Sequence, residues 1–269
     1  MTDAGLPYAR AIGDGGSRVV FLHGLFGQGR NWTQIGKALA DRHRVLLVDL
    51  PHHGRSGWEA DFDYLRVADQ VAALLDAADP VALVGHSLGG KVAMVLALRH
   101  PELVERLCVV DVSPVVYDHL SEFEKYVAAM RGLDLGSLKE RGEADAALVA
   151  AVPDPTVRGF LLQNLRRDGD TWRWQANLEV LGASLSTIGG WPESRLAGLR
   201  PYAGPVLWVA GARSPYVRPE YAAAMDRWFP GNRKVTVKDA GHWVHSEQPE
   251  VFGEVLRRFV EAPADRGAP

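Results

Sequence analysis

VALVGHSLGG, residues 81–90, combines an apolar run, a tight turn and the start of a second apolar segment. The run over 81–85 has the length and composition of a strand buried on both faces of a parallel sheet. Residues 88–100 predict a helix, so Ser87 stands between a buried strand and a helix. This is the context of a nucleophile elbow, a strained turn with small neighbours that exposes the serine hydroxyl at the edge of a sheet. We therefore predict that Ser87 is a nucleophile.

On both sides of this segment, short apolar runs alternate with segments of helical periodicity. The predicted strands cover 18–23, 44–49, 81–85, 107–111, 205–210 and 234–237, and the predicted helices cover 31–41, 62–77, 88–100 and 251–260. Such alternation is typical of an α/β fold with a mostly parallel sheet and right-handed crossovers. At the start of the chain, residues 8–12 and the strand from 18 flank GDGGS, which predicts a hairpin turn between them.

Residues 113–201 break this alternation. Apolar side chains recur there at helical spacing, and no strand–helix rhythm is present. The pattern predicts a helical insertion that lies as a lid over the ends of the sheet. We expect residues 1–112 and 202–261 to form the core domain, and residues 262–269, APADRGAP, to form a flexible tail.

Composition excludes several classes of protein. Of the 269 residues, 47% are hydrophobic and 23% are charged, which is typical of a soluble globular protein, and the net charge of −3 gives no basic surface for nucleic acid. Cys108 is the single cysteine, so no intrachain disulfide forms. The N-terminus lacks the apolar core of a signal peptide, and the most apolar stretch, 81–98, is interrupted by polar residues and glycines. We expect a cytoplasmic protein without a membrane span.

A serine nucleophile needs a base, and His242 is the best placed of the nine histidines. It follows the last predicted strand, which brings it to the same sheet edge as Ser87, and it comes late in the chain as the order serine, acid, histidine requires. The alternatives are a loop histidine without function and a metal pair with His245, but a third metal ligand is missing.

HGLFG (residues 23–27), GHSLGGK (85–91), GHWVH (241–245) and the insertion together resemble the α/β-hydrolase superfamily over nearly the whole chain. GHSLGGKVAM and the DVSPVVY segment are similar to a branch that includes the bacterial esterase YbfF and the ABHD11 type. The resemblance implies an α/β-hydrolase fold, with a mostly parallel central sheet flanked by helices and a helical lid insertion. It also implies a serine hydrolase with a Ser-His-acid triad.

The acid is the least obvious member of the triad. In most members of the superfamily it follows the strand predicted here at 205–210, but Ser214 stands where the aspartate is expected. The similar branch implies that the acid is Asp111, at the end of the preceding strand. Two neighbouring parallel strands can reach the same imidazole, and a carboxylate at the end of a buried strand is costly unless it is paired. Glu220 is the alternative acid.

Two backbone amides are expected to form an oxyanion hole. One belongs to Leu88, which follows the nucleophile, and the resemblance assigns the other to Leu25 in the HGLFG loop. Phe26 and His86 are expected to line the substrate pocket. For Lys91 we expect a solvated or ion-paired residue on the helix after the elbow.

These residues together predict a serine hydrolase that cleaves small-molecule carboxylic esters or thioesters without a metal or organic cofactor. A C–C bond hydrolase or a perhydrolase would use the same triad. A receptor-like protein without catalysis is a further alternative, because a fold does not determine a function. A dinucleotide-binding oxidoreductase is disfavoured, since Trp32 occupies the position of the third glycine of its motif. The natural substrate and the oligomeric state cannot be inferred from the sequence.

Overall fold

The computed structural model describes residues 5–263, and in this range seven strands form one sheet in the order β1-β3-β2-β4-β5-β8-β9. All pairs are parallel except the edge pair of β1 with β3. The strands are β1 (Ala9–Ile12), β2 (Arg18–Leu22), β3 (Arg44–Val48), β4 (Val81–His86), β5 (Val104–Val110), β8 (Val206–Gly211) and β9 (Asn232–Val237). Central strands β2, β4 and β8 are rich in Val, Leu and Phe because both of their faces are covered.

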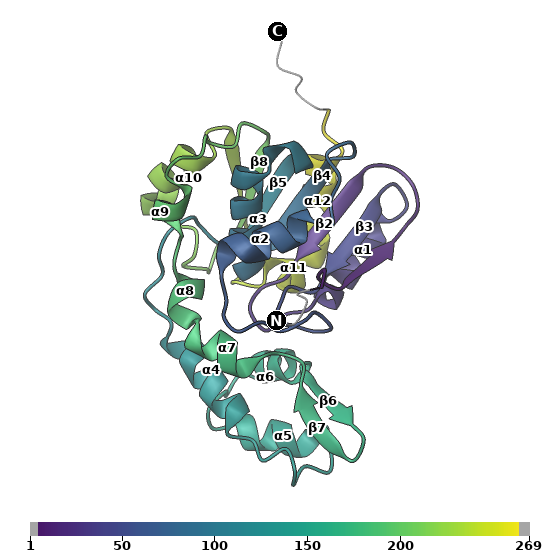
Figure 1. The fold of residues 1–269 in the computed structure, drawn as a ribbon, viewed down its shortest axis with the longest axis vertical. Helices are drawn as coiled ribbons and strands as arrows, with labels where there is room; N and C mark the ends of the chain where they lie inside the picture. Colours follow the sequence, from purple (N-terminus) through teal and green to yellow (C-terminus); the bar gives the residue numbers. More distant parts are fainter. Residues whose placement is uncertain (1–4, 264–269) are drawn as a thin grey trace.

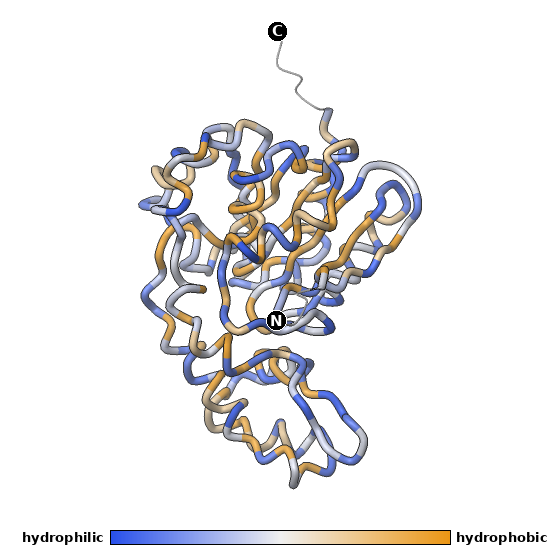
Figure 2. The backbone as a smooth tube through the Cα atoms, in the orientation of Figure 1, coloured by the Kyte–Doolittle hydropathy of each residue, from blue (hydrophilic) through white to orange (hydrophobic). Residues whose placement is uncertain are grey.

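Helices cover the sheet on both faces (Figure 1). α2 (Tyr64–Ala72), α3 (Leu88–Arg99) and α10 (Ala222–Trp228) contribute to one hydrophobic cluster, whereas α1 (Thr33–Leu39), α11 (Val244–Glu247) and α12 (Pro249–Val260) contribute to the other. Figure 2 shows the apolar strands as orange tubes between these layers. Three short 3₁₀ turns complete the core at Gly29–Trp32, Pro101–Leu103 and Pro219–Tyr221. The predicted fold class, a mostly parallel sheet flanked by helices, is confirmed.

The prediction of a hairpin at the start of the chain is wrong. β1 pairs antiparallel with β3, not with β2, and β2 lies between β3 and β4 in two parallel ladders. Both edges of β2 are therefore occupied, whereas β3 has an edge free for β1. The linking glycines Gly13 and Gly16 have φ of 74° and 75°, and a Cβ on either would collide with backbone at the end of α1 or just after it. These glycines let the chain cross to the far side of β3.

Residues between β5 and β8 form the segment drawn in teal and green in Figure 1; most of it lies below the sheet, whereas α9 lies beside α10. It contains α4 (Ser121–Arg131), α5 (Arg141–Leu148), α6 (Pro155–Leu162), α7 (Leu178–Ala183), α8 (Leu185–Gly189) and α9 (Glu193–Leu196). It also contains an antiparallel hairpin, β6 (Leu165–Asp168) with β7 (Thr171–Trp174), which the sequence analysis missed. In β6, Leu165 is buried, whereas the three charged residues that follow it, Arg166, Arg167 and Asp168, are partly or fully exposed. We call this segment, residues 113–201, the insertion.

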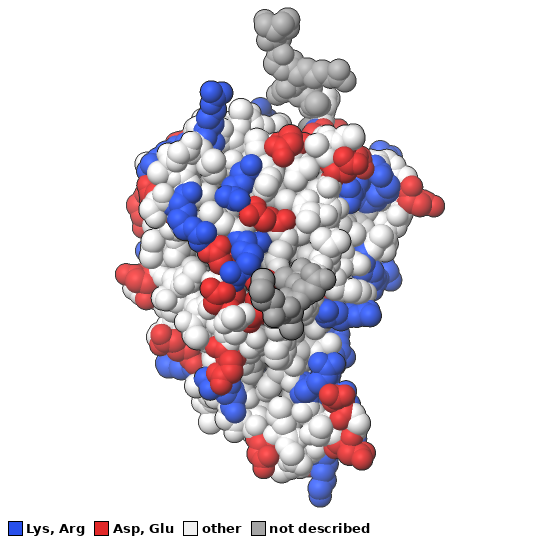
Figure 3. All heavy atoms as spheres, in the orientation of Figure 1, with Lys and Arg blue, Asp and Glu red and all other residues white. Residues whose placement is uncertain are grey.

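The described residues include no helix that combines the length and the apolar character needed to cross a bilayer. Figure 3 shows acidic and basic side chains intermingled over the face it draws, without a broad area of one charge. Of the predicted tail, residues 264–269 lie outside the described residues, and the carbonyl of Ala262 accepts a hydrogen bond from Arg106 at 3.0 Å.

Candidate active site

Ser87 lies at the turn between β4 and α3, with φ of 51° and ψ of −117°. A non-glycine residue with positive φ is strained, and this turn persists because the chain around it is tightly packed. A Cβ on Gly85 would come within 2.2 Å of the Gly89 carbonyl oxygen, and one on Gly89 would come within 2.5 Å of the His23 carbonyl oxygen. The glycines therefore let α3 approach β4 and β2 closely, which puts Ser87 at the carboxyl edge of the sheet.

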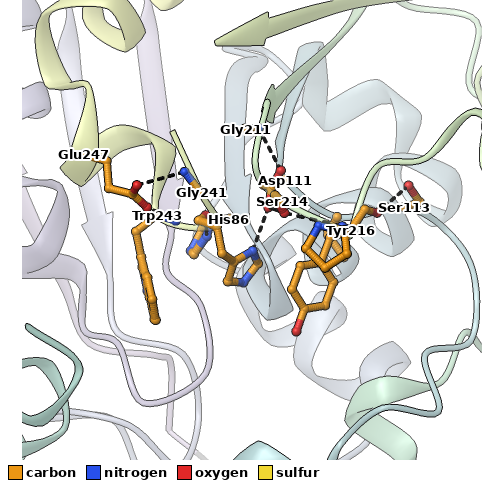
Figure 4. A network of polar contacts seen from close by, with 12 residues as sticks. His86, Asp111, Ser113, Gly211, Ser214, Tyr216, Gly241, Trp243 and Glu247 are labelled. Carbon is orange, nitrogen blue, oxygen red and sulfur yellow. Dashed lines mark hydrogen bonds and ion pairs between the residues drawn. The ribbon is translucent and has the colours of Figure 1, made fainter. Parts of the chain in front are cut away.

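His242 and Asp111 meet at this same edge, although 131 positions separate them in the sequence. Nδ1 of His242 donates to Oδ2 of Asp111 over 2.7 Å, as the dashed contact in Figure 4 shows. The side chain of Asp111 is fully buried, and that of His242 is 14% exposed. A buried carboxylate beside a ring N–H fixes the tautomer, so Nε2 of His242 carries the lone pair that a base needs.

The loop after β8 completes the surroundings of Asp111. Gly211 N donates to Oδ1 over 2.9 Å, and the hydroxyl of Ser214 donates to Oδ2. Ser214, at the position where an acid is more usual, thus serves the carboxylate of the neighbouring strand instead (Figure 4). Glu220, the alternative acid, is exposed in the turn before α10 and pairs with Arg218 at 3.5 Å. The geometry favours Asp111 over Glu220 as the partner of His242.

Ser87 and His242 line one cavity together with Phe26, His86 and Trp243. His86 donates from Nε2 to the carbonyl of His242 over 2.8 Å, and its ring lies 4.7 Å from the His242 ring. Tyr216 packs against the His242 ring at 4.3 Å between centroids. These contacts hold the imidazole in place, while Nε2 of His242 makes no hydrogen bond to any residue within 5–263.

The loop after β2 offers an amide for the predicted oxyanion hole. His53 Nε2 accepts from Phe26 N over 3.2 Å, and His23 Nε2 accepts from Leu50 N over 2.9 Å, which ties the HGLFG loop to the turn after β3. In contrast, the N–H groups of Leu25 and Leu88 donate to no residue in the described part of the chain. Both residues border the space beside Ser87. These two amides are therefore free to bind a negatively charged oxygen.

Sequence analysis missed one polar residue of this region, Asn164, and wrongly expected another, Lys91, to be exposed to solvent. Asn164, buried in the insertion, donates to the carbonyl of Phe26 over 2.7 Å and accepts from Gln28 over 2.8 Å. Lys91, expected to be solvated, is instead buried and donates to the carbonyls of Val115, Gly189 and Gly190 at 3.0, 2.7 and 2.6 Å. Burial lowers the pKa of Lys91 to about 7, whereas the three carbonyls stabilise its charged form. Both side chains hold the insertion against the core. Neither residue is part of a sequence motif, so the neighbouring residues could not reveal its role.

The remaining histidines near the site are structural. Burial lowers the pKa of His23 to about 4 and that of His245 to about 3, and it holds the pKa of His53 and of His86 well below the usual value. His245 stacks on Trp32 with 4.1 Å between ring centroids, so it is not half of a metal pair with His242. In the described part of the chain, no group of three or more His, Cys, Asp or Glu side chains is arranged to hold a metal ion.

These buried neutral histidines predict acid sensitivity. Their folded-state pKa values lie below the 6.5 of an unfolded chain, so the stability they provide is complete above pH 6.5 and is lost as pH falls toward 4. For His23 alone the loss approaches roughly 3 kcal/mol. Urea denaturation should therefore give a midpoint that falls more steeply from pH 6.5 to 5 than from pH 8 to 7, where the lowered pKa of Lys91 alone contributes a slope.

The matched variant is His245→Phe, which keeps an aromatic ring against Trp32 but removes one titrating group. Its urea midpoint should fall less steeply between pH 6.5 and 5 than that of the unmodified protein. A midpoint that stays constant down to pH 5 in the unmodified protein would contradict the assignment of these histidines as neutral.

Comparisons with known proteins agree with this fold. A family model described as "alpha/beta hydrolase fold" matches residues 17–249. The sn-1-specific diacylglycerol lipase ABHD11 of Mus musculus is 39% identical over 250 residues, which cover 90% of this chain and 80% of that protein. Esterase YbfF of Escherichia coli (strain K12) is 30% identical over 246 residues, covering 91% and 93%. Among solved structures, a marine microorganism esterase matches with a TM-score of 0.90 and 30% identity over 94% of this chain and 99% of that one.

Proposed function

The chain belongs to the α/β-hydrolase family, and it is a hydrolase of the esterase type; from this we propose that Ser87, His242 and Asp111 form its catalytic triad and that it works through an acyl-enzyme. Its substrates are small-molecule esters, in keeping with the esterases and lipases it is similar to. The triad proposal extends to thioesters, because the same acyl transfer releases either an alcohol or a thiol.

One observation carries the proposal. Within residues 5–263, His242 is the only histidine that borders the Ser87 cavity and also donates to a fully buried carboxylate. His86 borders the same cavity, but its Nε2 is committed to a backbone carbonyl, and its pKa is held low by burial and by the neighbouring His242 and His245. The strained turn at Ser87 and the free amides of Leu25 and Leu88 add the nucleophile and the site for the oxyanion.

In the first half of the reaction, Ser87 Oγ attacks the ester carbonyl carbon while its proton passes to Nε2 of His242. The carbonyl oxygen becomes an oxyanion between the amides of Leu25 and Leu88. Asp111 stabilises the imidazolium through Nδ1. His242 then returns the proton to the leaving oxygen or sulfur, the bond to the carbonyl carbon breaks, and the acyl group remains on Ser87. Water repeats the sequence and releases the carboxylic acid.

An acyl-enzyme should be trapped during turnover. We expect a burst of p-nitrophenolate close to one equivalent per protein when p-nitrophenyl butyrate is mixed rapidly with the protein, because acylation by a reactive ester outpaces deacylation. Acid quenching followed by peptide mass spectrometry should find the butyryl group on the peptide that contains Ser87. The control is protein unfolded in urea before mixing, which should carry no adduct at this serine.

An adduct on Lys91 or Cys108 instead of Ser87 would contradict the proposed nucleophile. Turnover without any covalent adduct under rapid quenching would contradict the acyl-enzyme.

A further inference from the structure

The loop after β2 contains a tight turn, residues 24–27, that carries the Leu25 amide. Gly27 N donates to the carbonyl of Gly24 over 2.9 Å, which closes the turn. Phe26 occupies the third position with φ of 60°, a conformation that glycine or asparagine usually adopts in such a turn. The backbone of a phenylalanine is strained there, so contacts from outside the turn must hold it. We call residues 24–27 the amide turn.

The direction of the Leu25 N–H depends on the carbonyl at the other end of the same peptide unit. A trans peptide is planar, so its C=O and its N–H point in opposite directions. The carbonyl of Gly24 accepts from Gly27 N and from Nδ1 of His23, the latter over 2.8 Å. These two donors fix the plane of the peptide and leave the Leu25 N–H on the side away from them. If the amide turn opened, one of the two donors would be lost.

Phe26 is held from two sides. Its N–H donates to Nε2 of His53, in the turn after β3, over 3.2 Å. Its carbonyl accepts from Nδ2 of Asn164, in the insertion, over 2.7 Å. Gln163 Nε2 lies farther from this carbonyl, at 3.4 Å, and Gln163 Oε1 accepts from Asn31 over 2.7 Å. Within residues 5–263, Asn164 therefore makes the shortest hydrogen bond between the insertion and the amide turn.

The surroundings of Asn164 fit an amide side chain in one orientation. The residue is fully buried, and burial of an amide is costly unless its polar groups are paired. Oδ1 accepts from Nε2 of Gln28 over 2.8 Å, which directs Nδ2 toward the carbonyls of Phe26 and Leu161, the latter at 3.2 Å. The backbone carbonyl of Asn164 accepts from Gln175 N over 2.7 Å. Asn164 thus connects the end of α6 and the β6–β7 hairpin to the amide turn.

From these contacts, and resting on the proposed acyl-transfer function, we propose that Asn164 is a positioning residue for the oxyanion hole. Through the carbonyl of Phe26 it holds the amide turn in the strained form that directs the Leu25 N–H to the oxyanion. A hydrogen-bond donor lowers the barrier most when it is already aimed at the place where the charge develops. The insertion therefore contributes to catalysis through the backbone of the amide turn.

Asn164→Ala removes the donor to the carbonyl of Phe26. We expect kcat for p-nitrophenyl butyrate to fall by about tenfold or more, because loss of a whole oxyanion donor costs about 10²- to 10³-fold and here one donor is misdirected. Acylation and deacylation both pass through an oxyanion, so both slow down, and KM should change by less than about twofold. The measurement is initial rate against ester concentration.

Two ketones separate a positioning role from a general role in the fold. A trifluoromethyl ketone with a butyl chain adds to the serine and places an oxyanion in the hole, whereas the methyl ketone with the same chain binds without this adduct. In Asn164→Ala, inhibition by the trifluoromethyl ketone should weaken by about the same factor as kcat/KM, and inhibition by the methyl ketone should stay unchanged. Equal weakening of both would overturn the proposal, since a distorted pocket affects them alike.

Asn177→Ala is the matched control. Asn177 is a second buried asparagine of the insertion, and its side chain caps α7 by accepting from Val180 N over 3.2 Å. Loss of this cap should lower the melting temperature but leave kcat and the ratio of the two ketone inhibition constants as in the unmodified protein. The same loss of kcat in Asn164→Ala and Asn177→Ala would show that Asn164 only supports the fold.

Asn164→Asp keeps the size of the side chain and the acceptor for Gln28, so it provides the test if Asn164→Ala does not fold. Its carboxyl can donate to the carbonyl of Phe26 only when it is protonated, and burial raises the pKa of a carboxyl group. The kcat of Asn164→Asp, divided by that of the unmodified protein at the same pH, should therefore rise as the pH is lowered from about 9 to about 6. A ratio that does not change with pH would overturn the proposal.

Failure of the positioning role and failure of the proposed function give different results. If p-nitrophenyl butyrate is hydrolysed in a Ser87-dependent way but Asn164→Ala behaves like Asn177→Ala, the role of Asn164 is wrong. If that ester is not hydrolysed, or is hydrolysed without Ser87, the proposed function itself is wrong.

Discussion

Replacing Ser87 with alanine is expected to lower kcat for p-nitrophenyl acetate by on the order of 10³-fold or more. The change removes the hydroxyl that we propose attacks the carbonyl, while the Cβ and the backbone of the turn stay in place. The free amides of Leu25 and Leu88 remain, so some rate above that of water should persist. The measurement is initial rate against ester concentration, with the melting temperature recorded for each protein.

Ser186→Ala is the matched control for this variant, since Ser186 is exposed on α8 and borders neither of the two cavities that include Ser87. It should retain the rate of the unmodified protein. Equal rates for Ser87→Ala and the unmodified protein would leave the nucleophile unassigned. A large drop in melting temperature for Ser87→Ala would attribute the loss to the strained turn instead.

Asp111→Asn is expected to cost on the order of 10²- to 10⁴-fold in kcat. In the structure Oδ1 accepts from Gly211 N, and Oδ2 accepts from both His242 and Ser214. An asparagine that keeps its oxygen toward Gly211 presents its NH₂ to Nδ1 of His242. The imidazole then carries its proton on Nε2, where it cannot act as a base. Turning the amide over would bring two buried donors, the NH₂ and Gly211 N–H, face to face.

Two further variants make the Asp111 experiment decisive. Glu220→Gln alters an exposed carboxylate paired only with Arg218 and should leave the rate unchanged. Ser214→Ala removes one hydrogen bond to Oδ2 but keeps the tautomer of His242, so it should cost far less than Asp111→Asn. If kcat falls strongly in Glu220→Gln and stays unchanged in Asp111→Asn, the acid has been misassigned.

The order of apolar and polar residues along the chain predicted the structure correctly where residues a few positions apart decide it. The strand ending at His86, the turn at Ser87 and the helix from Leu88 all follow from consecutive residues, because buried strands need apolar side chains and the sharp turn needs glycine. The same logic failed for the glycines after β1, where a turn signal was present but the strand paired with β3. A turn signal shows that the chain changes direction, and it does not show which edge of a sheet is free.

The burial of Lys91 and the hairpin in the insertion were also not predicted. Lys91 lies on a helix that the sequence predicted correctly, yet its ammonium is buried against three carbonyls from the insertion. The partners of Lys91 lie far away in the chain, so no window of sequence contains them. The hairpin of β6 and β7 is local, but it was missed because only helical spacing was recognised in this segment.

By itself, then, the sequence determined the family of fold, the elbow at Ser87 and the candidate residues Asp111 and His242, since strands, turns and helices depend on side chains a few positions apart. The tertiary structure alone decided that Asp111, and not Glu220, reaches His242, that Ser214 donates to this carboxylate, and that the amides of Leu25 and Leu88 lie free beside Ser87. These features depend on which strands become neighbours and in what register, and that is settled by packing of the whole chain.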